Sequence, residues 1–107
     1  RSRFTLNSPV DLDKDVSVAD GAVIGPYAVL GRHVAVGKNA HISNSVIFSG
    51  ASVGDSAWVN GAIIGEEAQI GDNVRVGKGC IVADHAKIRQ GVTLNEDTAV
   101  CPAREVS

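Results

Sequence analysis

The stretch ISNSVIFSGASVGDSAWVNGAII, residues 42–64, decides the fold because it contains two short phrases that resemble each other. The phrase ISNSVI begins at Ile42, and the phrase VNGAII begins at Val59, 17 positions later. In both phrases an aliphatic residue returns after five positions, whereas elsewhere in the chain it returns after six. A repeat this short has to be explained before any single motif is interpreted.

The six-residue repeat covers nearly the whole chain of 107 residues. Six residues are too few for a strand and a helix, but they are enough for one short strand and one tight corner. Three such units close a triangular coil, and successive coils stack by parallel strand pairing about 4.8 Å apart. We expect the repeated aliphatic residues to point into the prism; they are Leu12, Val18, Ile24, Leu30, Val36, Ile42, Ile47, Val53, Val59, Ile64, Ile70, Val76, Val82, Ile88, Leu94 and Val100.

These positions predict an all-β protein, a parallel β-helix shaped as a triangular prism of about five coils. The β-helix is expected over residues 12–101, with residues 102–107 as a C-terminal tail. Residues 1–11 are expected to be a lead-in from an upstream domain, because the chain starts Arg-Ser-Arg and contains no methionine. The chain is therefore interpreted as a fragment or a processed piece.

The two five-residue units fall on the same wall in consecutive coils. The step from Ile42 to Ile47 is five, and so is the step from Val59 to Ile64. Paired deletions of this kind keep neighbouring strands in register, whereas a single deletion would shear the ladder. The alternative is chance slippage of the repeat.

One of the three walls is apolar on its outside. Neighbours of an inward residue point outward in a strand, and ten outward positions beside Leu30, Ile47, Ile64, Val82 and Val100 carry no charge. A flat apolar patch usually marks an interface, although β-propensity alone also favours Val and Ile in a strand. The predicted interface residues are Val29, Val46, Phe48, Ile63, Ile81 and Ala99.

Residues with catalytic or metal-binding chemistry are scattered. His33 and His85 occupy equivalent corners three coils apart, roughly 14 Å by strand spacing, and His41 lies on another wall. Within one chain they cannot share a zinc ion. No phosphate-binding glycine motif occurs. We therefore assign no catalytic, cofactor-binding or metal residue. Cys80 is interpreted as packing in a corner, and Cys101 has no neighbouring base in the repeat. The acidic residues interpreted as solvated corners are Glu66, Glu67, Asp72 and Asp84.

Charge and composition limit the partners. The net charge of −2 gives no reason to expect nucleic acid or an anionic membrane surface as a partner. No apolar run approaches the length of a membrane span. Two cysteines make no disulfide framework, so a cytoplasmic location is expected.

The hexad pattern resembles the left-handed parallel β-helix of hexapeptide-repeat proteins, and the left hand is implied by that resemblance. The phrases ISNSVIFSGASVG and VNGAIIGEEAQIGDNVRVG resemble the C-terminal β-helix of sugar-1-phosphate nucleotidyltransferases. Within that family the resemblance is strongest to proteins similar to mannose-1-phosphate guanylyltransferase. In that group a shortened x-N-S-V/I-I unit recurs, as at residues 43–47 here. The second unit departs from it, with Gly61 and Ala62 in place of Asn-Ser.

The resemblance implies that catalysis, with Mg²⁺, belongs to an N-terminal domain and that this segment is an accessory domain without a cofactor of its own. Its expected partner is another copy, through the apolar wall, or its own catalytic domain. The alternative is a small hexapeptide-repeat acyltransferase that uses acetyl-CoA. Such enzymes commonly extrude a long corner loop and place a histidine base between subunits, and a metal site between subunits as in γ-class carbonic anhydrases is a further alternative. This chain shows no corner insertion.

Overall fold

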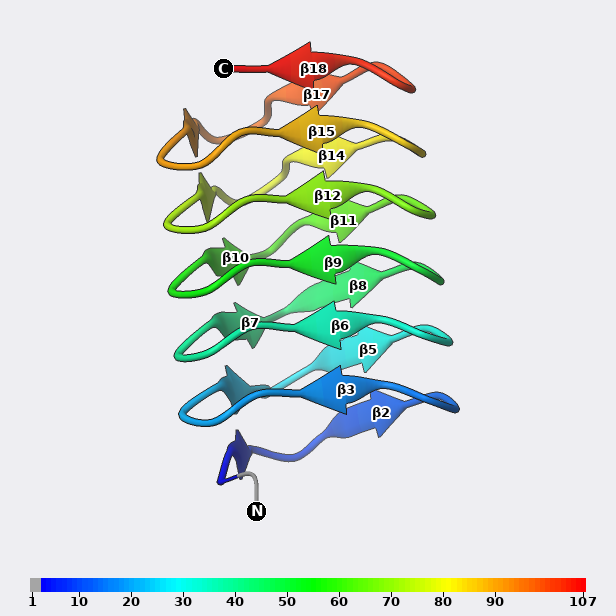
Figure 1. The fold of residues 1–107 in the computed structure, drawn as a ribbon, viewed down its shortest axis with the longest axis vertical. Helices are drawn as coiled ribbons and strands as arrows, with labels where there is room; N and C mark the ends of the chain where they lie inside the picture. Colours follow the sequence, from blue (N-terminus) through cyan, green and yellow to red (C-terminus); the bar gives the residue numbers. More distant parts are fainter. Residues whose placement is uncertain (1–2) are drawn as a thin grey trace.

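The computed structural model describes residues 3–107, and its regular structure there is entirely β-strand (Figure 1). Within this range no helix is long and apolar enough to cross a membrane. The strands are β1 (Thr5–Leu6), β2 (Val10–Leu12), β3 (Ser17–Val18), β4 (Val23–Ile24), β5 (Ala28–Leu30), β6 (Ala35–Val36), β7 (His41–Ser43), β8 (Ser45–Ile47), β9 (Ser52–Val53), β10 (Trp58–Asn60), β11 (Ile63–Ile64), β12 (Gln69–Ile70), β13 (Arg75–Val76), β14 (Ile81–Val82), β15 (Lys87–Ile88), β16 (Thr93–Leu94), β17 (Ala99–Val100) and β18 (Glu105–Val106).

The strands form three parallel sheets of six strands each, and three consecutive strands make one coil. The first sheet has the order β1-β4-β7-β10-β13-β16, the second β2-β5-β8-β11-β14-β17 and the third β3-β6-β9-β12-β15-β18. In Figure 1 the third sheet lies in front, and its strands run from right to left while the chain climbs, so the coils wind left-handed. The predicted left-handed β-helix is confirmed, with six coils where the sequence indicated about five.

The solenoid extends past the predicted span of residues 12–101 at both ends. β1 pairs with β4 so that Leu6 lies opposite Ile24, and β18 pairs with β15 so that Val106 lies opposite Ile88. Residues within the predicted lead-in, 1–11, and within the predicted tail, 102–107, thus form strands. Leu6 is nevertheless 46% exposed, since within residues 3–107 β1 pairs only with β4 on one side.

The core is one continuous column of aliphatic side chains inside the prism. Fourteen of the sixteen predicted inward residues are buried, and the two others, Leu12 and Val18, are partly buried in the first coil. Small residues such as Ala22, Ala40 and Ala57 are fully buried at the corners. No buried side-chain nitrogen or oxygen within residues 3–107 lacks a hydrogen-bond partner. Regular stacking therefore supplies the close packing that stabilises a small domain.

Several corners are held by an aspartate that reaches down to the coil below. Asp55 Oδ1 accepts a hydrogen bond from the Lys38 backbone N–H, and Asp72 Oδ1 accepts one from the Asp55 N–H, each at 2.8 Å. A Cβ placed on Gly54 would lie 2.5 Å from Asp72 Oδ1. A side chain at position 54 would therefore displace the Asp72 carboxylate and break its hydrogen bond with the Asp55 N–H.

The two five-residue units form short corners that stack on each other. Only Asn44, with φ +50°, separates β7 from β8, and Gly61, with φ +78°, begins the equivalent corner one coil later. The Gly61 N–H donates to the Ser43 carbonyl at 3.1 Å, and Asn44 Nδ2 donates to Asn60 Oδ1 at 3.2 Å. Since β7 and β10 pair with Ser43 opposite Asn60, the predicted in-register deletion is confirmed.

Lengthening one of the two five-residue units to six residues should destabilise the protein more than lengthening both. A single glycine inserted after Asn44 separates that corner from Gly61 and should cost at least about 1 kcal/mol of unfolding free energy, the value of one lost hydrogen bond. A second glycine after Gly61 lets the two corners match again. Urea unfolding of both variants is the measurement, and a double insertion no more stable than the single one would contradict the pairing.

Candidate functional site

The outward face of the second sheet, called here the apolar wall, brings five of the six predicted interface residues into one column. Strand pairing places Val29 opposite Val46, Val46 opposite Ile63, Ile63 opposite Ile81, and Ile81 opposite Ala99. Val29 and Ile63 are each 43% exposed and Ile81 is 50% exposed. The structure therefore shows a continuous apolar column across five coils, exposed except at the half-buried Val46; its role as an interface stays a prediction.

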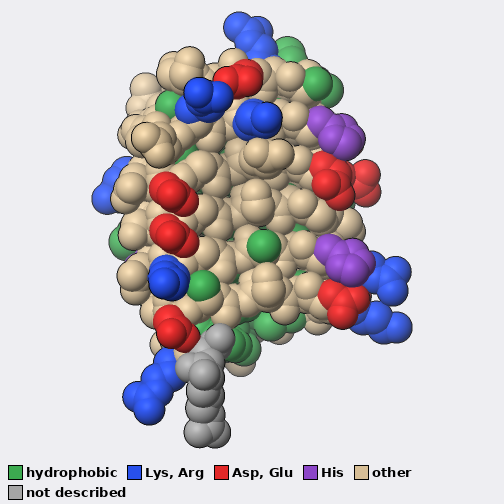
Figure 2. Space-filling model, viewed as in Figure 1, with side chains coloured by type: hydrophobic (Ala, Val, Ile, Leu, Met, Phe, Trp, Pro, Cys, Tyr) green, Lys and Arg blue, Asp and Glu red, His purple; other side chains and the backbone are tan. Residues whose placement is uncertain are grey.

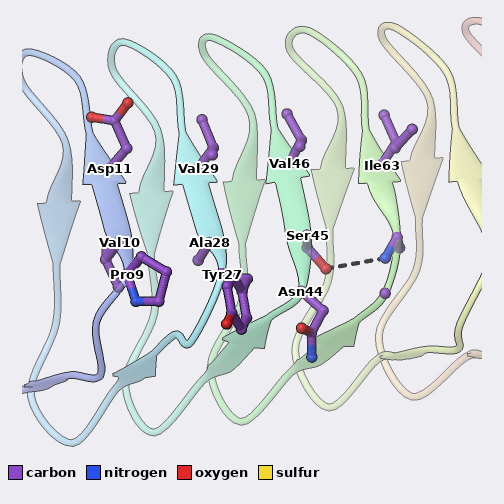
Figure 3. Close-up of a pocket in the computed structure, with 12 residues that line it drawn as sticks. Pro9, Val10, Asp11, Tyr27, Ala28, Val29, Asn44, Ser45, Val46 and Ile63 are labelled. Carbon is purple, nitrogen blue, oxygen red and sulfur yellow. Dashed lines mark hydrogen bonds between the residues drawn. The ribbon is translucent and has the colours of Figure 1, made fainter.

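The column ends in a charge that the sequence reading left out of this wall. Asp11 pairs with Val29, so its exposed carboxylate continues the row below the first coil of apolar residues. Figure 3 shows Asp11, Val29, Val46 and Ile63 side by side on successive strands. The repeat already placed Leu12 as an inward residue, which makes its neighbour Asp11 outward, so this position could have been found.

Phe48 stands beside the column rather than in it. It follows β8, as Gly65 follows β11, and it is 46% exposed. The coil above it carries Gly65 at this position and the next coil carries Ala83, so a hollow of about 400 Å³ lies next to the ring. The hollow is lined by Phe48, Ile63, Gly65, Glu66, Ile81, Val82, Ala83 and Asp84.

A larger notch lies on the other side of the column, where the two short corners shorten the edge of the prism (Figure 3). Its volume is about 540 Å³, within the range of small-molecule sites. The exposed Tyr27 borders it below the short corners, and Asn44 and Gly61 lie in it. Its lining is mostly apolar, and it opens onto Val29, Val46 and Ile63 of the apolar wall. The notch therefore continues the wall around the prism edge.

Ser45 is the buried polar residue that supports this edge. Its side chain is 3% exposed, its Oγ donates to the Ser43 carbonyl at 2.7 Å, and the same Oγ accepts the Ala62 N–H at 3.1 Å. The hydroxyl thus joins the two short corners across neighbouring coils. Because both of its hydrogen bonds are internal, Ser45 holds the notch rather than offering a group to a ligand.

The histidines do not form a common site. His33 lies 3.8 Å from Asp15, but both side chains are more than half exposed, so this ion pair contributes little. His85 occupies the equivalent corner three coils away, as the sequence predicts. Figure 2, which looks onto the third sheet, shows histidine and acidic side chains along one edge of that face.

A stacked trio occupies the outside of the first sheet. The His41 and Trp58 rings stack at 4.2 Å between centroids with an angle of 11°, and the Arg75 guanidinium lies 5.4 Å from the Trp58 ring centre. Strand pairing places the three residues in one outward column, with Trp58 opposite both His41 and Arg75. Because the two neighbours cover the indole, the trio stabilises this face.

The remaining candidates have structural roles. Cys80 is buried and its thiol donates to the Asn95 carbonyl at 3.0 Å, whereas Cys101 is exposed; both are free. Asp84 Oδ1 accepts the Glu66 N–H at 2.8 Å, as a corner residue. Across residues 3–107 no group of three His, Cys, Asp or Glu side chains could hold a metal ion.

Comparison with known proteins places this geometry in a family. A family model described as the GMPPB C-terminal domain matches residues 6–107. The Bifunctional protein GlmU of a Synechococcus species is 32% identical over 93 residues, which are 87% of this chain and 21% of that protein. The Bifunctional protein GlmU of a Nostoc species is 34% identical over 76 residues, 71% of this chain and 17% of that protein. The chain thus spans about a fifth of the length of these relatives.

Solved structures share the fold. A GDP-perosamine N-acetyl transferase from Caulobacter crescentus, solved with CoA and GDP-perosamine, superposes with a TM-score of 0.85 at 19% identity, over 91% of this chain and 47% of that one. A hexapeptide transferase family protein from Anaplasma phagocytophilum gives a TM-score of 0.81 at 23% identity, over 98% of this chain and 70% of that one. At these identities the likeness shows the fold alone.

Replacing Ser45 by alanine should destabilise the notch edge. The Ala62 N–H would lose its buried acceptor, a loss of about 1–3 kcal/mol of unfolding free energy. Ser52→Ala, an outward position on the third sheet, is the matched control and should change stability little. Thermal melts of the two variants compare them, and equal stabilities would show that the Ser45 hydroxyl does not hold the corner.

Proposed function

This chain belongs to the GMPPB C-terminal domain family, and on that premise we propose that it is the accessory β-helix domain of a sugar-1-phosphate nucleotidyltransferase. The observation that carries the proposal is the match of the family model over residues 6–107, nearly the whole solenoid. In this proposal the nucleotidyl transfer and its Mg²⁺ belong to another domain of the parent enzyme, and this domain contributes assembly and packing. A cytoplasmic location fits the two free cysteines.

The geometry of the corners supports a role without catalysis in this domain. No connection between strands within residues 3–107 is longer than four residues, so no extruded loop forms a cleft. The His33, His41 and His85 side chains lie on different faces or distant coils. Within residues 3–107 the carboxylate paired with a histidine, that of Asp15 at 3.8 Å from His33, is exposed like the imidazole itself, so this pair does not form an enclosed catalytic site.

Acyl transfer from acetyl-CoA is the second candidate, and it rests on the structural likeness to the N-acetyl transferase solved with CoA. Two observations weigh against it. The identity of 19% carries the fold only, and the corners here are as short as the repeat allows. The sequence relationship to the GMPPB C-terminal domain family is the more direct support.

The apolar wall is the part of this domain that we propose for assembly. An apolar column in which Val29, Ile63 and Ile81 are exposed, beside the exposed Phe48, is larger than scattered exposure of single residues. Its occupant is another copy of the chain or the catalytic domain of the same enzyme. The net charge of −2 favours neither nucleic acid nor a membrane as a partner.

The 107-residue chain should bind neither nucleoside triphosphates nor acetyl-CoA, because its sequence contains no phosphate-binding glycine motif and, within residues 3–107, its strands are joined only by short corners. Isothermal titration calorimetry with GTP, dTTP, ATP and acetyl-CoA is the measurement. Binding of acetyl-CoA in the low micromolar range would favour the acyltransferase candidate. Binding of a triphosphate with that affinity would contradict the accessory role.

Placing charges on the apolar wall should prevent association without unfolding the prism. Phe48→Lys and Ile63→Lys alter outward side chains, each worth roughly 1.5–3 kcal/mol when fully buried. Ala35→Lys with Gln69→Lys, at exposed outward positions of the third sheet, is the charge-matched control. Sedimentation velocity compares both double variants with the wild type, and a wild type that stays monomeric at high concentration would show that the wall does not mediate self-association.

A further inference from the structure

The apolar wall has a shape and charge pattern that complement themselves. We propose that its partner is a second copy of this chain, packed face to face with the prism axes antiparallel, so that Phe48 of each copy fills the hollow over Gly65 of the other. This inference rests on the proposed function in one respect, namely that the wall is a docking surface. It adds which partner occupies the wall and in which orientation.

The orientation follows from one two-fold axis. The axis runs along the strand direction, midway between β8 and β11, the two central strands of the second sheet. Rotation about it turns the wall over, so β8 faces β11 of the second copy, β5 faces its β14, and β2 faces its β17. Such an isologous contact uses the same patch on both copies and closes as a dimer.

Phe48 and Gly65 provide the shape complementarity. Each residue directly follows an inward aliphatic residue, Ile47 or Ile64, and these two are paired in the ladder. The two-fold axis therefore places Phe48 opposite Gly65 of the second copy, where the hollow of about 400 Å³ lies open. A Cβ at Gly65 would lie 2.5 Å from Asp84 Oδ1, so the fold itself keeps this position free of a side chain.

The column residues also match across the axis. Val46 faces Ile63 of the second copy, and Val29 faces its Ile81, so apolar side chains meet apolar side chains at every central level. The five apolar residues of the column span roughly 19 Å by strand spacing, and Phe48 widens the patch towards the corner. A contact over the whole wall thus involves all six strands of the second sheet in each copy.

The charges select the antiparallel orientation. Arg32 and Asp84 are exposed at equivalent corner positions, two residues after β5 and two residues after β14. Because β5 faces β14 of the second copy, Arg32 faces Asp84 of that copy, and the symmetry makes this contact twice. Asp11, at the end of the column, faces Ala99 of the second copy. Complementary charges of this kind fix orientation more than they add affinity.

Arrangements with parallel prism axes, either two-fold or three-fold, lack this match. They place each coil level beside the same level of the neighbouring copy, so the exposed Asp11 carboxylates lie near each other. Phe48 then also lies level with Phe48 of the neighbour, and the hollow over Gly65 stays empty. The antiparallel dimer avoids both costs.

Cross-linking between single-cysteine variants tests the orientation. In a Cys101→Ser background, which leaves only the buried native thiol of Cys80, one protein carries Val29→Cys and a second protein of different tag length carries Ile81→Cys. A bis-maleimide that spans the roughly 10 Å between packed sheets is added to each protein alone and to the two after mixed refolding. Refolding of the chain is expected because its core is one continuous cluster.

We expect covalent dimers in the mixture and none in either protein alone, because residue 29 faces residue 81 of the other copy. Cross-links within each protein alone would overturn the antiparallel arrangement and indicate parallel axes, while leaving the proposed assembly role intact. No cross-link together with a monomer in sedimentation would overturn the second copy as partner and indicate the catalytic domain instead. A mixture that also carries Phe48→Lys should lose the cross-link, whereas the Gln69→Lys control should keep it.

Discussion

Parallel stacking of coils, in which each residue lies above its counterpart in the preceding coil, is the constraint on which this structure depends. The backbone N–H of one coil donates to the carbonyl of the next, as between Trp58 and Val74 at 2.9 Å. A change in one coil therefore requires a matching change in its neighbour. At single residues, an aspartate at one corner requires a glycine in the coil below it, as Asp72 requires Gly54. In chain length, the short corner at Asn44 is matched by the short corner at Gly61 in the next coil.

The paired deletions also explain why the apolar wall has a depression at one edge. Two consecutive corners that each lose a residue shorten the prism edge between Tyr27 and Gly79, and a notch of about 540 Å³ results. The ladder stays intact because Ser45 joins both corners through its hydroxyl. The irregularity in residues 42–64 thus shapes the surface while the inward column continues unbroken.

Most of the fold could be predicted because inward positions in a solenoid admit few residue types. The aliphatic residue at every sixth or fifth position indicated the sheets, the register and the apolar column. The end coils were missed because Leu6 and Val106 continue the repeat without the small corner residues that accompany it elsewhere. Phe4 and Arg104 stand two positions before them, where other coils carry small residues such as Ala22 and Ala40.

The surface could be predicted only in part, since outward positions are restricted by neighbours in other coils. The hollow beside Phe48 depends on Gly65 and Ala83, 17 and 35 positions later in the chain, and the stack of His41, Trp58 and Arg75 spans three coils. Reading each outward column along the prism axis would have found both features. A list of residue types in sequence order does not show them.

The same geometry explains why chemistry is sparse within one copy. Along an outward column, residues that act together must occupy adjacent coils, because strand spacing separates more distant levels by roughly 10 Å or more. His33 and His85 lie in the same corner column. The neighbours of His85 in the adjacent coils are Glu67 and Ala103, and those of His33 are Asp15 and Gly50. Each histidine thus has at most one acidic neighbour in its column and no third group to orient the pair. A repeat that commits its inward positions to packing and its corners to aspartates and glycines leaves the walls as its variable surfaces.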